Sequence, residues 1–185
     1  RKDKVLLIAH ADTVFGDDEL KIAYKDFNYF SAKKGVGIGA DDRAGCAILW
    51  KLKDLGHSLL IPNAEEKHCV GSFFLMKQDG WREKINDHQF AIQFDRANSR
   101  DLVSYDVGTS DFTKWLEKSI PGYKSSPGSF TDIKVLFDRY KHDVKKVICA
   151  VNISIGYYGQ HGDGETLNVT EWNRTLSMAR TLHCT

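Results

Sequence analysis

Residues 37–45 read Gly-Ile-Gly-Ala-Asp-Asp-Arg-Ala-Gly, and a run of helical character follows at 46–52. The glycines favour a tight turn, because a residue without a Cβ atom tolerates unusual backbone angles. Asp41 and Asp42 then open the helix, where an acidic side chain is electrostatically favourable. Taken alone, the two aspartates are explained as a helix cap, but the strands predicted around them change that interpretation.

The first of these strands is residues 5–9, a continuous apolar run that favours a buried parallel strand. His10-Ala-Asp12 follows it directly. Side chains two residues apart in an extended chain face the same way, so His10 and Asp12 share one side. They lie just past the carboxyl end of the strand, which is where open α/β sheets bind their ligands.

Three further predicted strands end in the same way, with an acidic residue or a histidine after an apolar run. Pro62 is awkward in a central strand and predicts an edge strand or an irregular end. The strands, with the residues that follow them, are 59–64 with Glu65 and Glu66, 90–94 with Asp95, and 147–155 with a glycine-rich loop that holds His161.

The predicted strands alternate with predicted helices along the chain. The helices are expected at about 41–55, 70–77, 110–118, 131–140 and 170–183, with Gly56 ending the first and Thr170 capping the last. This alternation favours an α/β fold, namely a three-layer α/β/α sandwich around a mostly parallel mixed sheet. The polar stretch 16–34 reads as a long functional excursion with a possible short strand at 21–24.

Composition excludes several classes of function. A net charge of +1 over 185 residues predicts neither a nucleic-acid surface nor a polybasic membrane surface. No apolar run approaches the roughly 20 residues of a membrane-spanning helix. The four cysteines are scattered without a Cys-x-x-Cys pair, which argues against a structural zinc knuckle and favours a reducing compartment, so a cytoplasmic protein is expected.

The residues at the strand ends form a candidate metal site. Imidazole and carboxylate groups without thiolates are a ligand set that suits zinc, cobalt or manganese. With Asp41, five groups are available, too many for one catalytic tetrahedral ion that keeps an open position. They fit two divalent ions about 3.5–4 Å apart that share one bridging carboxylate.

The ordered motifs of the chain resemble the co-catalytic di-zinc exopeptidases, a group that includes tripeptidases, glutamyl and leucine aminopeptidases and related amidohydrolases. The resemblance extends from residue 5 to about residue 170. The motifs are His10-x-Asp12-Thr13, Gly39-Ala-Asp41-Asp-x-Ala-Gly45, Glu65-Glu66 and His161-x-x-x-Glu165, and residues 128–132 and 152–158 also look like family segments.

The resemblance implies a division of the ligands between two zinc ions. His10, Asp41 and Asp95 would bind one ion. Asp41, Glu66 and His161 would bind the other, so that Asp41 bridges the two.

The resemblance also implies two catalytic roles. Asp12 would orient His10 through the second ring nitrogen of the imidazole. Glu65 would be the general base that takes a proton from the water shared by the ions and later delivers it to the leaving amine. Alternation supports this division, because adjacent carboxylates after a strand point apart.

Three functions stay open on the sequence. The first is a metallopeptidase, most readily an aminopeptidase, that removes a terminal residue from a short peptide. The second is an amidohydrolase acting on N-acyl amino acids, and the third is a non-catalytic relative that binds metal. We expect a single catalytic metallopeptidase domain over 1–185 without an inserted lid, because the stretch between Asp95 and His161 reads as continuous core. The oligomeric state is left open.

Three residues near the site have more than one interpretation. Thr131 and Asp132 match a family segment, but a helix N-cap explains them equally well. Arg96 either neutralises Asp95, binds a substrate carboxylate or is a surface arginine.

Overall fold

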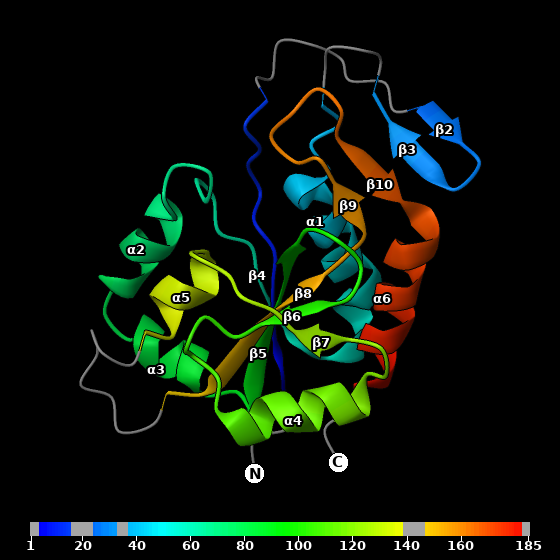
Figure 1. Ribbon diagram of the computed structural model, residues 1–185. Helices are drawn as coiled ribbons and strands as arrows, with labels where there is room; N and C mark the ends of the chain where they lie inside the picture. Colours follow the sequence, from blue (N-terminus) through cyan, green and yellow to red (C-terminus); the bar gives the residue numbers. More distant parts are fainter. Residues whose placement is uncertain (1–3, 16–23, 33–36, 139–146, 183–185) are drawn as a thin grey trace.

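A six-stranded sheet runs through the middle of the molecule in this computed structural model, which describes residues 4–15, 24–32, 37–138 and 147–182 (Figure 1). Its strand order is β4-β1-β5-β8-β6-β7. The first four strands in this order are parallel, β6 runs antiparallel to β8, and β7 runs parallel to β6. The strands are β1 (Leu6–Ile8), β4 (Ser58–Leu60), β5 (Phe90–Arg96), β6 (Asp101–Val103), β7 (Lys124–Ser125) and β8 (Cys149–Ser154).

Helices cover both faces of this sheet (Figure 1). On one face lie α1 (Ala40–Leu52) and α6 (Val169–Thr181), and α4 (Ser110–Ser119) packs at the end of the same cluster through Leu116. On the other face lie α2 (Val70–Met76), α3 (Trp81–Asn86) and α5 (Asp132–Leu136). The predicted three-layer α/β fold with a mostly parallel mixed sheet is therefore confirmed.

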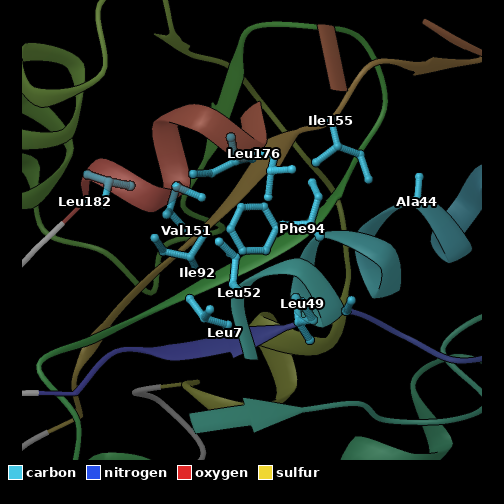
Figure 2. Packing of buried hydrophobic residues seen from close by; sticks show 14 of the residues in the cluster. Leu7, Ala44, Leu49, Leu52, Ile92, Phe94, Val151, Ile155, Leu176 and Leu182 are labelled. Carbon is cyan, nitrogen blue, oxygen red and sulfur yellow. The ribbon is translucent and has the colours of Figure 1, made fainter. Parts of the chain in front are cut away.

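Two buried clusters follow from the alternation of side chains along the central strands. In β1, Leu7 points into the cluster under α1 and α6, whereas Leu6 and Ile8 point into the cluster under α3 and α5. Figure 2 shows Phe94 of β5 at the centre of the first cluster, between Leu52 of α1 and Leu176 of α6. Because both faces of the central strands are buried, these strands read as continuous apolar runs in the sequence.

A second, antiparallel sheet was not predicted from the sequence. Its order is β2-β3-β10-β9, with β2 at Tyr24–Asp26, β3 at Tyr29–Ser31, β9 at Tyr157–Tyr158 and β10 at Thr166–Asn168. The pairing of β3 with β10 joins a segment before α1 to the loop that carries His161. Of the strand predicted at 21–24, residues 21–23 lie outside the described part, and Tyr24 begins β2.

Several predicted boundaries can be compared directly with the structure. β4 lies at the edge of the sheet, as Pro62 predicted, and Gly56 follows the short 3-10 turn at Lys53–Leu55 that ends the first helix. The prediction that Thr170 caps α6 was wrong, because the cap is Asn168, whose side chain accepts hydrogen bonds from the Thr170 and Glu171 amides.

Other boundaries differ in extent. α3 was not predicted, and α5 is shorter than the predicted 131–140, whose last two residues lie outside the described part. Asp95 belongs to β5 rather than following it. Within the described residues, no helix has the length and apolar character needed to cross a membrane.

The approach of α1 to β5 leaves no room for a side chain at Gly45. A Cβ atom at this position would overlap the carbonyl oxygen of Phe94 and the carboxylate of Asp42. Gly45 therefore fixes how closely the start of α1 can lie against the central sheet.

We predict that Gly45→Ala destabilises the chain by about 2–3 kcal/mol, because the backbone of β5 cannot move aside cheaply. The measurement is urea unfolding of the variant and the parent. Gly164→Ala is the matched control, since a Cβ atom there meets nothing within 4 Å and its stability should change by no more than about 0.5 kcal/mol. Equal stability of the two variants would contradict the packing argument.

Candidate metal centre

Five predicted ligand residues come together beyond the carboxyl ends of the central strands. They come from the end of β1, the start of α1, the turn after β4, the end of β5 and the loop between β9 and β10. These residues are His10, Asp41, Glu66, Asp95 and His161. His10, Asp41 and Asp95 are buried, whereas the side chain of His161 is half exposed.

Asp41 lies between the two histidines. Its Oδ1 is 3.0 Å from Nε2 of His10, and its Oδ2 is 3.2 Å from Nε2 of His161. Nε2 of His10 also lies 3.3 Å from Oδ1 of Asp95. Nε2 of His161 lies 3.0 Å from Oε2 of Glu66. Each oxygen of Asp41 therefore faces a different histidine, and each histidine faces one further carboxylate.

The charges of this cluster are unbalanced among the described residues. Burial, followed by the charges of neighbouring carboxylates, raises the pKa of Asp41 to about 6. Burial alone would lower the pKa of His10, but its hydrogen bonds to Asp41 and Asp95 outweigh burial and hold that pKa well above its usual range. The site therefore favours positive charge.

Two features of the cluster suit a metal cation: a buried carboxylate oxygen without a hydrogen-bond partner, and ligand atoms that lie close together. Oε1 of Glu66 is buried and makes no hydrogen bond to the described part of the chain. The ligand atoms of His10, Asp41 and Glu66 lie within 4.8 Å of one another, as do those of His10, Asp42 and Asp95. Nitrogen and carboxylate oxygen donors without thiolates are the donor set of zinc, cobalt and manganese sites.

Asp42 belongs to the second of these groups but is already bound by the backbone. Its Oδ2 accepts a hydrogen bond of 3.0 Å from the His10 amide, and its Oδ1 accepts one of 3.0 Å from the Gly45 amide. The side chain is completely buried. Asp42 thus ties the start of α1 to the end of β1, a role that the sequence indicated only as helix capping.

Asp12 makes contacts beyond the one expected with His10. Its Oδ1 lies 3.4 Å from Nδ1 of the imidazole. The same carboxylate accepts hydrogen bonds from the amides of Glu65, at 3.0 Å, and Glu66, at 3.2 Å. Asp12 therefore holds the turn that carries both glutamates as well as facing the histidine.

Asp95 is held by side chains that sequence reasoning missed. Its Oδ2 accepts hydrogen bonds from Nε2 of Gln93, at 2.7 Å, and from the Thr131 hydroxyl, at 2.8 Å. Its backbone amide donates to Asn152. Oδ1 faces His10 and also accepts a longer hydrogen bond of 3.4 Å from the Tyr157 hydroxyl, so the carboxylate is oriented by its neighbours. Gln93 carried a usable signal, since it is polar in an apolar strand and shares a side with Asp95.

Thr131, Asp132 and Arg96, which had more than one interpretation in the sequence, each make specific contacts in the structure. The Thr131 hydroxyl donates to Asp95 and does not cap α5. Asp132 is completely buried and accepts a hydrogen bond of 2.6 Å from the Ser72 hydroxyl. Arg96 pairs with Asp101, with 3.4 Å between Nε and Oδ2, and donates to the Pro127 carbonyl.

Glu165 anchors the turn that carries Asp41. Its carboxylate accepts hydrogen bonds from the amides of Gly39, at 2.5 Å, and Asp41, at 3.0 Å, and the side chain is buried. Glu165 stood in the late histidine motif without an assigned role, and a hydrogen bond to a distant backbone amide leaves no trace in sequence spacing.

Glu65, the predicted base, is half-buried beside the cluster. Burial, followed by the charge of Asp95, raises the pKa of its carboxyl group to about 8. A carboxyl group with such a pKa exchanges protons near neutral pH, which general acid–base chemistry requires.

Several solved peptidase structures share this fold. Aminopeptidase PepT from Bacillus cereus ATCC 10987 aligns with a TM-score of 0.70 and 15% identity over 96% of this chain and 79% of its own. A tripeptidase from Staphylococcus aureus aligns with a TM-score of 0.71 and 13% identity over 96% and 79%. The TET1 peptidase of Pyrococcus horikoshii gives 0.66 and 12% over 99% and 84%. No protein-family model and no curated protein sequence matches the chain.

We predict that the stabilisation of the protein by divalent zinc grows as the pH rises. The raised pKa values mean that Asp41 and Glu65 bind protons more tightly in the folded chain than in the unfolded chain. The stability of the metal-free protein should therefore fall between about pH 4 and pH 8, where these groups lose their protons. A bound metal ion neutralises the deprotonated carboxylates. It competes with protons for the same oxygens, so it binds more tightly as the pH rises.

The measurement is the melting temperature with and without zinc between pH 5 and pH 8. The difference between the two curves should widen by about 4 °C or more across this range. Glu66→Gln should reduce the widening, whereas Asp111→Asn, which changes an exposed acid on α4, should leave it intact. A difference that stays constant with pH would contradict the prediction.

Proposed function

We propose that this chain is a metal-dependent exopeptidase that hydrolyses the terminal peptide bond of short peptides, most readily as an aminopeptidase. The observation that carries the proposal is the position of Asp41. Its two oxygens face histidines from opposite ends of the chain, at 3.0 and 3.2 Å, which is the arrangement that a bridging carboxylate between two ions requires.

Two divalent ions would be held by the clustered side chains. His10, Asp41 and Asp95 would bind one ion, and Asp41, Glu66 and His161 would bind the other. Zinc suits these donors best, with cobalt or manganese as substitutes. When bound, the ions would supply Lewis-acid activation of the attacking water and of the scissile carbonyl group.

Glu65 would move the proton in this reaction. It would take a proton from the attacking water and deliver that proton to the amine that leaves. Glu66, its neighbour, faces His161 instead, at 3.0 Å. The amides of both glutamates donate to Asp12, so one carboxylate fixes the turn from which the base and the ligand diverge.

The substrate would lie in a cavity that adjoins the cluster. The cavity has a volume of about 530 Å³, within the size range of small-ligand sites, and its lining includes Asp12, Glu66 and Lys67. The names of the structural neighbours, an aminopeptidase and a tripeptidase, point to a short peptide as the substrate.

We predict that the protein loaded with zinc, cobalt or manganese hydrolyses aminoacyl anilides and unblocked tripeptides. N-acetyl amino acids and N-acetylated tripeptides should be poor substrates, because they lack the free amine. The measurement is the initial rate on each member of the panel with and without chelator. Preferential hydrolysis of N-acetyl amino acids would contradict the peptidase proposal and favour an amidohydrolase. Absence of turnover on the panel at full metal occupancy would favour a non-catalytic metal protein.

A pair of variants separates metal binding from proton transfer. The parent chain should saturate at two ions. Glu65→Gln should keep both ions and lose about 10²–10⁴-fold in kcat, because only the proton transfer is removed. Glu66→Gln should lose one ion, and excess metal should partly restore its activity.

The measurement is metal content by elemental analysis together with turnover at several metal concentrations. The two substitutions change adjacent residues of the same type, so each is the matched control of the other. Loss of metal in Glu65→Gln with retention in Glu66→Gln would reverse the two assignments. Normal turnover in Glu65→Gln with both ions bound would rule out Glu65 as the base.

A further inference from the structure

A buried polar cluster lies against Glu65 on the side of α2 and α5. Its members are Cys69, Ser72 and Asp132, and all three side chains are completely buried. Cys69 precedes the first residue of α2, Ser72 lies in its first turn, and Asp132 is the first residue of α5. None of these residues is a predicted metal ligand, and burial of three polar groups together in one contact between helices needs an explanation.

Asp132 has one oxygen that the protein does not satisfy. Its Oδ1 accepts the Ser72 hydroxyl at 2.6 Å, whereas Oδ2 is buried and accepts no hydrogen bond of normal geometry from the described residues. Besides Ser72, the Cys69 thiol contributes to the surroundings that set the pKa of this carboxyl group. An ionised carboxylate is costly in such surroundings unless a donor can reach it.

The Cys69 thiol lies between two carboxyl groups. Its Sγ is 3.5 Å from Oε1 of Glu65, in the geometry of a donated hydrogen bond. Burial, followed by the charges of Asp132 and Glu65, holds the pKa of Cys69 well above its usual range, so the group is a thiol with one proton to donate. That proton can serve only one of the two carboxyl groups at a time.

The backbone keeps the thiol beside the glutamate. The Cys69 amide donates to the Glu65 carbonyl at 2.9 Å, which closes a turn between the two residues. The amide of Glu65 itself is held by Asp12. These two hydrogen bonds hold the backbone of both residues, which keeps the Cys69 thiol close to the Glu65 carboxyl group.

We propose that Cys69 is a positioning residue for Glu65, with its buried thiol donating to Oε1 of the glutamate and with Asp132 as a competing acceptor in the same cluster. The inference rests on the proposed function, in which Glu65 is the base. The thiol donates to Oε1 and holds the Glu65 carboxyl group in one orientation. Asp132, buried in the same cluster, is the second carboxyl group that could accept from this thiol.

The kinetic test uses Cys69→Ala and Cys69→Ser in the zinc-loaded protein. Cys69→Ala should lower kcat about tenfold, the value of one hydrogen bond, with KM and metal content unchanged. Cys69→Ser, which keeps a donor, should recover most of the loss. Cys149→Ala removes a half-buried thiol at the start of β8 and is the control that should keep the parent kcat.

A second background separates positioning from a merely structural role. In Glu65→Gln, removal of the Cys69 thiol should cause no further loss of the residual rate, because its partner is already gone. An equal loss in both backgrounds would overturn the inference, as would an unchanged kcat in Cys69→Ala. If Glu65→Gln keeps full turnover, the proposed function itself fails; if Glu65→Gln is impaired and Cys69→Ala is not, only the inference fails.

A spectroscopic measurement tests the hydrogen bonding of the Cys69 thiol without any turnover. The infrared S–H stretch of Cys69 is identified by its loss in Cys69→Ser. The band should shift in Glu65→Gln and again in Asp132→Asn, since each substitution weakens one acceptor of the thiol. A band that stays at the parent frequency in both variants would overturn the inference.

Discussion

The crowding of carboxylates around His10 is the constraint on which the rest of the structure depends. Asp41 and Asp95 face one nitrogen of its ring, and Asp42 binds its backbone amide. One imidazole cannot balance three buried acids. The protein therefore fixes some of their oxygens with neutral donors, as Gln93 does for Asp95. The oxygens of Asp41 and Asp95 that face His10 define where a cation would bind.

Long-range polar contacts give this arrangement its shape. Glu165 binds the turn before Asp41, and Asp12 binds the turn before Glu66. Thr131 reaches Asp95 from the start of α5. Each contact joins segments that lie far apart in the sequence, while the parallel strands beneath supply a rigid base. The ligand side chains are thus oriented by the protein itself, which lowers the cost of ordering them when a ligand binds.

The sequence predicted the parts of the fold that depend on apolar runs. The strand before His10, the strand before Asp95 and the helix after Asp42 all bury one or both faces, and burial is what periodicity reports. β9 and β10 escaped prediction because strands of two or three residues carry too little pattern, and β10 forms by pairing with β3 on one side and β9 on the other.

The site was predictable to the extent that strand ends collect functional residues. Position in the chain brought the five candidate ligands together, but it could not reveal which oxygen of Asp95 would face His10. Thr131 illustrates the limit. A threonine before an aspartate at a helix start suits an N-cap and a contact to a neighbouring carboxylate equally well, and only the distance to Asp95 separates the two.

Adjacent residues with opposite directions organise the whole site. Asp41 faces the histidines, whereas Asp42 is bound by backbone amides. Glu66 faces His161, whereas Glu65 contacts the Cys69 thiol. In each pair, the protein holds one carboxyl group with its own hydrogen-bonding groups and leaves the other facing a histidine. This division explains how so many acids can be buried in one place. Asp42 serves as a structural anchor, and the repulsion of like charges is confined to the few oxygens that a cation would neutralise.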